Sequence, residues 1–527
     1  MFLRETKVKG KTYLNIVESY RKHGKILQRC IASLGRLDNL QNTEGLRKIA
    51  VRLLGYCKQN THLDITTTEE KQRKIWGAPV VIKKIWDKFG LDDLFSRTTK
   101  SRKIKFDFFS AVFLMVLDRL CKPVSKLKSY EEQDKYYGIK NNELQHLYRA
   151  LDILADKKED IEKYLFDKNK SLFNTKVDMV FYDVTTLYFE SVRPDNFKDF
   201  GFSKDLKVNE VQIVLGLLLD QEGRPIGYDL FPGNIYEGHT VKETIEKLQK
   251  RFQIQRLVFV GDKALLSKDN LQLISSSGYE YIVGYRIKNA KKDTQEKILD
   301  ERGYIEAKIK DEDEVFRYKE IKEKENRIIC SFSSKRAKKD RKERERSIEK
   351  AQMLLKSGKS IISKRGALRY VEVKKVVSPK IDEKKIKEDE KFDGYYAVIT
   401  NCQVFLGRDV LDIYHQLWKI EEAFRILKSH LEARPIFHWT EKRIKGHMML
   451  CFIAFLIERT LEIELKGSNI EYSPPKIKEA LNSLQFSDIE IEGQRFYLRS
   501  PVEGLAQDIV RILKIRIPAM ITTPEGF

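Results

Sequence analysis

Cysteine is scarce in this chain of 527 residues, and its spacing argues against two kinds of stabilising site. The six cysteines are Cys30, Cys57, Cys121, Cys330, Cys402 and Cys451. They form no CxxC pair and no cluster with histidine, so neither a disulfide framework nor a cysteine-rich zinc site is indicated. We therefore expect reduced cysteines in the core of a cytoplasmic protein.

Long apolar runs are also lacking. The two longest, FFSAVFLMVL and HMMLCFIAFLI, have the length of core helices and fall short of the ~20 apolar residues that a membrane span requires. The N-terminal residues carry no continuous apolar segment behind their charges, so the sequence gives no secretory signal. We expect no membrane partner.

Negative charge is outnumbered by positive charge. The chain has 100 Lys and Arg against 78 Asp and Glu, which gives a formal net charge of +22. A field of this sign favours a polyanionic partner, and nucleic acid is the leading candidate. A solvated basic surface without any such partner is the alternative that composition leaves open.

The pattern of apolar residues divides the chain into segments of different character. Residues 1–60 mix short alternating runs with glycine turns, which predicts a small β-rich unit. Residues 61–170 keep apolar side chains three and four apart, which predicts a helical and basic DNA-binding region. Residues 171–289 hold strand-like runs separated by two helices, which is typical of a mixed α/β sheet.

The second half of the chain interrupts the sheet pattern and then resumes it. Residues 290–392 are highly charged and contain short strand candidates, so we interpret them as an insertion. Within them, Lys335–Lys350 has nine basic and four acidic residues, which indicates either a salt-bridged solvated helix or one that contacts phosphates. Residues 393–465 resume the α/β pattern, and residues 466–527 form a C-terminal tail region.

Two aspartates follow or interrupt apolar strand-like runs. Asp183 lies in MVFYDVTTLY, and alternation directs it to the face opposite Asp178. Asp262 closes the run RLVFVGD, at the strand end where ligands bind in open α/β sheets. Each aspartate alone reads as a residue that ends a strand, but two of them on neighbouring strands favour a shared site.

A third carboxylate comes from the stretch Tyr414–His430, which reads as one amphipathic helix. At ~100° per residue, Glu422 lies opposite the apolar stripe and is expected in solvent. Glu421 lies along the edge of the stripe, nearly eclipsed with Tyr414 and Lys428. The alternative is a surface ion pair between Glu421 and Arg425, one turn apart.

Three converging carboxylates can hold two divalent ions. Such a pair of ions activates a water or hydroxyl and stabilises the leaving oxygen of a phosphoryl displacement. Hard Mg²⁺ or Mn²⁺ prefers oxygen ligands, which fits Asp183, Asp262 and Glu421.

These motifs resemble those of a known family. FYDVTTLYFE, VFVGDKALLSKDNL and YHQLWKIEEAFRILKSHLEARPIFHW resemble, in order and spacing, the DDE transposases of bacterial insertion sequences, of the insertion-sequence-four type. The resemblance implies a ribonuclease-H-like α/β core with a β-rich insertion between the second Asp and the Glu. The family signature Tyr-x2-Arg-x3-Glu-x6-Lys is met by Tyr414, Glu421 and Lys428, whereas Leu417 replaces the Arg.

The resemblance also implies a role for each residue. Asp183 would bridge two metal ions, Mg²⁺ or Mn²⁺, while Asp262 and Glu421 would each complete one site. The residues implied in DNA binding are Tyr414, Lys428, Arg425 and Lys263. In some relatives a tryptophan of the insertion stacks on a flipped base; this insertion has none, and the aromatic residues that could replace it are Tyr304, Phe316, Tyr318 and Phe332. Asn234 and His239 fit either a DNA contact or a turn and helix cap.

The sequence thus predicts a transposase that binds the terminal inverted repeats of its element, cleaves there and joins the 3′-hydroxyl to target DNA. We expect it to act as a homodimer, in the cytoplasm and in association with the nucleoid. Two alternatives remain open at this stage: a ribonuclease-H-like nuclease that does not join ends, and a DNA-binding descendant without catalysis.

Overall fold

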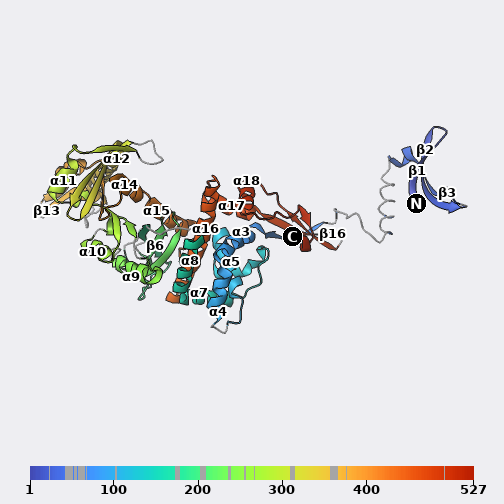
Figure 1. Ribbon diagram of the computed structural model, residues 1–527, viewed down its shortest axis with the longest axis horizontal. Coiled ribbons are helices and arrows are strands. Elements are labelled where there is room, and N and C mark those ends of the chain that lie inside the picture. The colour runs from blue at the N-terminus through green and yellow to red at the C-terminus, as the bar shows by residue number, and fades with distance from the viewer. Residues whose placement is uncertain are drawn as a thin grey trace. The chain divides into compact units, whose positions relative to one another are not determined.

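A computed structural model describes residues 1–22, 24–41, 52, 56, 66, 68–100, 104–172, 179–201, 209–235, 239–254, 257–265, 267–308, 315–356, 366–374, 377–491 and 493–527. The chain divides into two compact units, both drawn in Figure 1. The first consists of Met1–Arg73, Ser487–Arg499 and Pro518–Phe527, and the second of Lys74–Phe486 and Ser500–Ile517. Cys57 and Asp178 lie outside the described residues.

Short β-strands form most of the first unit. A three-stranded antiparallel sheet contains β1 (Phe2–Val8), β2 (Lys11–Lys22) and β3 (Lys25–Arg36), and is followed by α1 (Leu37–Gln41). Lys9 and Gly10 join β1 to β2 with φ of 50° and 77°, the left-handed pair that a two-residue hairpin requires. A second sheet has the strand order β18 (Ile521–Thr522), β17 (Gln494–Arg499), β16 (Gln485–Ile491) and β4 (Glu69–Ile75).

The second unit contains a group of helices built around one long apolar helix. The helices are α3 (Gly77–Phe89), α4 (Leu91–Lys100), α5 (Phe108–Cys121), α6 (Lys126–Glu131), α7 (Leu144–Asp156), α8 (Lys158–Leu172), α16 (Glu441–Gly467), α17 (Pro474–Ser483) and α18 (Gly504–Ile512). The middle of α16 is buried on every side and packs against α5 and α7. A Cβ at Gly446 would collide with the backbone of Leu151, so glycine permits this close packing of α16 on α7.

No helix in the described part of the chain is both long and apolar enough to cross a bilayer. Every described cysteine is free: Cys121, Cys330, Cys402 and Cys451 are buried, as expected, whereas Cys30 is exposed on β3. The prediction of a core position for Cys30 is wrong because β3 has little covering it among the described residues, and most of its side chains face solvent.

A nine-stranded mixed sheet forms the centre of the second unit. Its strands, in spatial order, are β10 (Ile305–Lys308), β11 (Val315–Glu323), β12 (Asn326–Phe332), β15 (Tyr395–Thr400), β9 (Glu280–Gly284), β8 (Val258–Gly261), β5 (Met179–Tyr188), β6 (Gln212–Asp220) and β7 (Pro225–Pro232). β5, β8 and β9 run parallel, whereas β6 and β7 form an antiparallel meander with β5. The connecting helices are α9 (Thr240–Phe252) and α10 (Lys268–Ser276). The prediction of a mixed α/β sheet is therefore confirmed.

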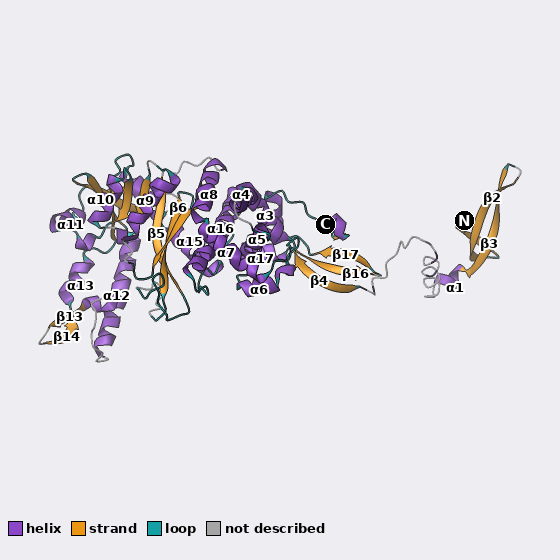
Figure 2. Cartoon of the chain, turned by 90° about the horizontal axis from the view of Figure 1, so that it is seen from below, coloured by secondary structure: helices purple, strands orange, loops and turns teal. Residues whose placement is uncertain are grey.

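The segment between β9 and β15 both extends the sheet and projects from it. β10, β11 and β12 pair in sequence and join β15, which itself pairs with β9. The other elements of the segment are α11 (Lys292–Leu299), α12 (Ser334–Lys356), β13 (Val371–Lys374), β14 (Val377–Ile381) and α13 (Glu383–Glu390). Figure 2 shows α12, α13 and the β13–β14 hairpin projecting away from the sheet. The charged stretch 335–350 lies within α12, so its prediction as a helix is confirmed.

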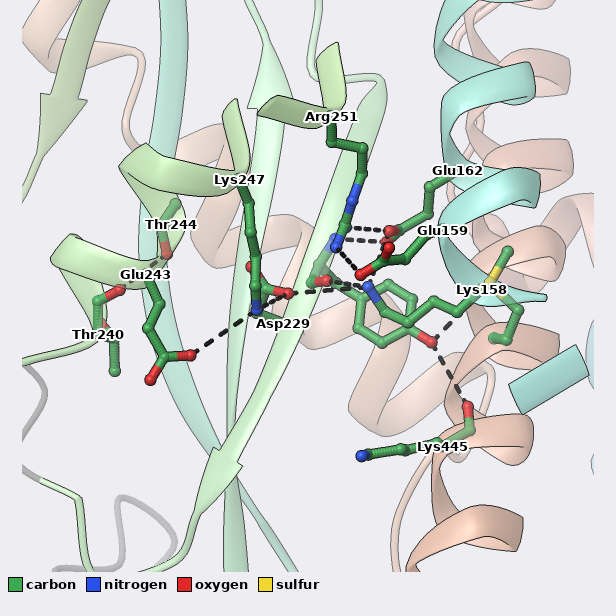
Figure 3. Close-up of polar contacts among 12 residues, drawn as sticks. Lys158, Glu159, Glu162, Asp229, Thr240, Glu243, Thr244, Lys247, Arg251 and Lys445 are labelled. Carbon is green, nitrogen blue, oxygen red and sulfur yellow. Dashed lines mark hydrogen bonds and ion pairs between the residues drawn. The ribbon is translucent and has the colours of Figure 1, made fainter. Parts of the chain in front are cut away.

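A buried ionic network fastens α8 to β7 and α9, as Figure 3 shows. Glu162 accepts from Lys158 at 2.8 Å and from Arg251, while Asp229 accepts from Lys247 at 2.7 Å. Lys158 also lies 3.7 Å from Asp229 and so links the two carboxylates. Burial raises the pKa of Glu162, although Lys158 and Arg251 favour its charged form. The network therefore depends on both cations remaining in place.

Removing one cation from this network should destabilise the second unit. Arg251→Met leaves Glu162, which is completely buried, short of a partner, and such losses cost about 3–5 kcal/mol. Lys163→Met, which removes the exposed partner of Asp167 on the same helix α8, should cost less than about 1 kcal/mol. Chemical denaturation of both variants measures the difference. Equal shifts in the two midpoints would show that the buried network contributes no more than a surface pair.

A second stability prediction concerns pH. Glu458 of α16 is 8% exposed, and burial raises its pKa from an ordinary value of 4.5 to about 8. The folded chain thus holds this proton more tightly than the unfolded chain. The stabilisation is complete below about pH 4.5 and is lost as the pH rises towards about 8. Glu458→Gln stays neutral, so its melting temperature should fall less than that of the wild type over this range. Parallel profiles would contradict the assignment.

Candidate active site and nucleic-acid interface

The parallel pairing of β5 with β8 brings the two predicted aspartates together. In this pairing Tyr182 lies beside Gly261. The residue that follows Tyr182 is Asp183, and the residue that follows Gly261 is Asp262. Neighbouring residues in a parallel sheet point to the same face from strands ~4.8 Å apart. Both carboxylates are half-buried at the carboxyl end of β8, the edge that the sequence predicted for a ligand site.

Each aspartate is held by a local backbone hydrogen bond. The N–H of Val184 donates to Oδ1 of Asp183 at 2.7 Å, and the N–H of Ala264 donates to Oδ1 of Asp262 at 2.6 Å. These bonds orient one oxygen of each carboxylate.

Glu421 lies on α15 (Trp418–Arg425), and this helix packs against β5. Its side chain is exposed and makes no hydrogen bond or ion pair within the described part of the chain. Across the described residues, no group of three or more Asp, Glu, His or Cys side chains is close enough to hold a metal ion. The structure thus brings Asp183 and Asp262 together and sets Glu421 on the adjoining helix, outside a closed cluster.

The predicted single helix over Tyr414–His430 is broken into three parts. These are α14 (Gly407–His415), α15, and the π-helical turn η7 (Ile426–His430). Between α14 and α15 the backbone bonds tighten to three-residue spacing, with Leu417 N–H donating to the Tyr414 carbonyl at 3.1 Å. The prediction of a continuous helix is wrong here, since such bonds turn the chain by more than the ~100° per residue of an α-helix.

Tyr414 connects the helix to the aspartates. Burial, together with the negative charges of Asp262 and Asp183, raises its pKa to about 12, so the hydroxyl stays protonated near both carboxylates. The phenol occupies the space above Gly284 of β9, where any Cβ would collide with it. Its ring also packs on Tyr396 of β15, with centroids 5.5 Å apart.

Tyr396 and Arg336, which the sequence did not single out, complete this cluster together with Lys263. The Arg336 guanidinium lies over the ring of Tyr396 at 4.6 Å, and Lys263 Nζ lies over the same ring at 5.0 Å. Burial lowers the pKa of Lys263, and the neighbouring charge of Arg336 lowers it further. Tyr396 could not be identified as a site residue from the sequence, because DGYYAVITN indicates only a strand. Arg336 could not be identified because it is one of many basic residues in α12.

A pocket of about 450 Å³ opens beside this cluster, and we call it the basic pocket. Its cationic lining residues are Lys263, Arg286, Lys288, Arg336, Arg344 and Arg369. Its aromatic lining residues are Tyr285, Tyr370, Phe392, Tyr395 and Tyr396. Arg344 is neutralised by Asp393 and Glu390, whereas Lys263 and Arg286 pair with no carboxylate in the described part of the chain. Free cations beside aromatic rings suit the phosphates and bases of a nucleic acid.

The other predicted DNA contacts lie along α15 and η7. Arg425 is exposed and lies 3.7 Å from Glu422, and Lys428 is half-buried in η7. The expectation that Glu422 faces solvent is wrong, because Glu422 accepts from Arg459 of α16 at 3.1 Å. Leu417 lies in the tight turn that precedes α15.

The remaining aromatic and loop candidates make local contacts. Phe316 is buried, the Tyr304 hydroxyl donates to the Ile298 carbonyl at 2.8 Å, and Phe332 packs on Tyr395. Asn234, in the loop after β7, donates to Asp199, in the segment between β5 and β6, at 2.8 Å. The other candidates on these segments are Tyr318, half-buried on β11, and His239, at the first position before α9.

Comparison with known proteins identifies the family. Residues 180–457, more than half of the chain, match the family described as Transposase DDE domain. Residues 3–62 match the family described as IS1634 family transposase, N-terminal domain. A stretch of 114 residues, 19% of the chain, is 26% identical to a probable transposase for insertion sequence element IS5377 of Geobacillus stearothermophilus, and it spans 30% of that relative.

Two solved structures are more distantly similar. A piggyBac transposase synaptic complex with hairpin DNA has a TM-score of 0.38 at 10% identity over 85% of both chains. A Mos1 transposase paired-end complex with left transposon end has a TM-score of 0.16 at 10% identity, over 46% of this chain and 74% of the other. On the match over residues 180–457, the chain belongs to the DDE transposase family, among the transposases of insertion sequences.

Proposed function

We propose that this transposase binds the terminal inverted repeats of its own insertion sequence, cleaves DNA there and transfers the 3′-hydroxyl ends to target DNA. The observation that carries the proposal is the side-by-side position of Asp183 and Asp262 at the end of β8 in a DDE transposase chain. A homodimer with one active site at each end of the element fits the need to process two ends. We propose that it acts on DNA in the nucleoid.

The proposed core is ribonuclease-H-like. The strand order β7-β6-β5-β8-β9, with β5, β8 and β9 parallel and β6 and β7 antiparallel, supports this assignment. We further propose the insertion-sequence-four type, supported by Tyr414, Glu421 and Lys428 at the signature spacing, with Leu417 in the Arg position. On this reading residues 290–392 are the insertion into the core, between residues 171–289 and 393–465, and residues 61–170 contribute to DNA binding.

Asp183, Asp262 and Glu421 are the proposed ligands of two Mg²⁺ or Mn²⁺ ions. The donor set fits, because all three groups are carboxylates and two of them are already adjacent. When bound, the ions would activate the attacking oxygen and stabilise the leaving oxygen of the phosphodiester. Glu421 is free of competing partners in the described part of the chain, so its carboxylate is available to the site.

The residues around the aspartates are proposed to bind the DNA backbone. The protonated hydroxyl of Tyr414 can donate a hydrogen bond to a phosphate oxygen near Asp183 and Asp262. Lys263 and Arg336 line the basic pocket; Lys263 pairs with no carboxylate in the described part of the chain, and Arg336 lies 3.7 Å from Asp340. Arg425 and Lys428 are proposed to contact the DNA along the other side of Glu421.

Substitution of the three carboxylates tests the catalytic proposal. Asp183→Asn, Asp262→Asn and Glu421→Gln should each lower the rate of Mg²⁺-dependent cleavage by more than about 100-fold, while binding of the element ends is retained. The assay uses labelled DNA that carries the sequences flanking the gene, together with a supercoiled plasmid as target.

The same assay separates the alternatives. Cleavage without any joined product would identify a nuclease rather than a transposase. Normal DNA function in Asp183→Asn would show that the carboxylate is not catalytic. Glu190→Gln, at an exposed acid just past the end of β5, is the matched control and should leave the rate unchanged.

The basic pocket makes a separate prediction about affinity. Arg336→Gln should weaken binding about equally for all DNA sequences and lower the slope of log affinity against log salt by about one. Arg302→Gln removes an exposed arginine that pairs with Asp300 outside the pocket, and should change neither quantity. Fluorescence anisotropy with labelled DNA at several salt concentrations measures both. An unchanged slope for Arg336→Gln would remove this residue from the interface.

A further inference from the structure

A single arginine of α16 joins the helix of Glu421 to the helical core. Arg459 Nη2 donates to Oε2 of Glu422 at 3.1 Å, and its Nη1 donates to Oε2 of Glu462 at 2.8 Å. Arg459 is only 9% exposed, and the side chain of Glu462 is 13% exposed. The contact is therefore a shielded link between α15 and α16 rather than a surface ion pair.

The surroundings of Arg459 make the guanidinium hard to replace. Glu422, Glu458 and Glu462 all lie around it, and burial raises the pKa of Glu462 to about 7. A planar group with five donors can bond two carboxylates at once, whereas a lysine ammonium lacks this fixed fork.

The helix α15 needs such an external support. It has eight residues, fewer than the ~12–15 below which an isolated helix is marginal in water. It begins at the tight turn through Leu417 and ends at the π-helical turn η7. Ile420, Ala423 and Phe424 are buried and hold one face of the helix against the core.

The position of Glu422 determines the direction of its neighbour. Successive side chains of an α-helix point in directions that differ by ~100° about the helix axis. Once the direction of Glu422 is fixed, the direction of Glu421 is therefore fixed as well. A second arginine acts at the far end of the same segment: Arg119 of α5 donates to the carbonyls of Leu431 at 3.3 Å and Glu432 at 3.1 Å. The segment from α15 through η7 is thus tied to two different helices.

We propose that Arg459 is a positioning residue, which holds Glu422 against α16 and thereby sets the rotation of α15 that directs Glu421 towards Asp183 and Asp262. This inference rests on the proposed function of Glu421 as a metal ligand. It assigns to Glu422 a role that is distinct from that of its catalytic neighbour. The contact of Glu422 with Arg459 holds the helix α15 against α16.

The experiment uses the full-length protein, with Mg²⁺ as the varied ligand. Arg459→Lys and Glu422→Gln should bind element ends within about twofold of the wild type. Their half-saturating Mg²⁺ concentration for cleavage should rise by about 10- to 100-fold, the usual effect of losing a residue that orients a metal ligand. The double variant should show no more than the larger single effect, since both changes break the same contact.

A matched control lies on the same helix. Lys466→Gln removes an exposed lysine of α16 that pairs with Glu471, and should leave the Mg²⁺ titration unchanged. Thermal unfolding of every variant separates positioning from stability. If Arg459→Lys does not fold, Glu422→Gln carries the test alone, because it removes the negative charge that pairs with Arg459 and keeps the size of the side chain.

The outcomes distinguish this inference from the proposed function. If Arg459→Lys and Glu422→Gln lower the melting temperature and leave the Mg²⁺ titration unchanged, Arg459 serves stability only, and the inference is overturned. If Glu421→Gln cleaves normally, the proposed role of Glu421 fails, and the inference fails with it. If Glu421→Gln is inactive and the Mg²⁺ requirement of the other two variants rises, both stand.

Discussion

The parallel pairing of β5 with β8 is the constraint on which the candidate site depends. It ends at Tyr182 and Gly261, so the first residues beyond the pairing are two aspartates that emerge at the same level of the sheet. Neither carboxylate has to be brought in by a loop. The antiparallel strands β6 and β7 on one side, and β9 on the other, keep β5 and β8 within a sheet that is buried on both faces.

The helical elements supply what the sheet cannot. A third carboxylate has to approach from outside the plane of the strands, and it comes from α15, which packs on β5. This helix is short, and its apolar residues form a stripe along one side. Such a stripe alone does not fix a single rotation of the helix about its own axis. Charged contacts from α16 and α5 add the specificity, since a guanidinium bonds a particular carboxylate or carbonyl where an apolar surface would tolerate rotation.

The sequence was sufficient for features that local patterns determine. Apolar runs predicted the two strands, with Asp183 inside one run and Asp262 at the end of the other. The break near Leu417 was not predictable, because it accompanies a contact made through the fold, in which Lys419 donates to the Gln221 carbonyl at 2.5 Å. Glu422 was misplaced for the same reason. Its partner Arg459 follows 37 residues later on another helix, and no periodicity within α15 reveals it.

The direct pairing of β15 with β9 has a mechanical consequence. The strand β15, which contributes Tyr395 and Tyr396 to the basic pocket, pairs through β9 with β8, and Asp262 directly follows β8. No hinge separates them along this hydrogen-bonded path. The spacing between these two tyrosines and the two aspartates is therefore set by the sheet, and a base stacked on the tyrosines would lie at a set number of nucleotides from the aspartates.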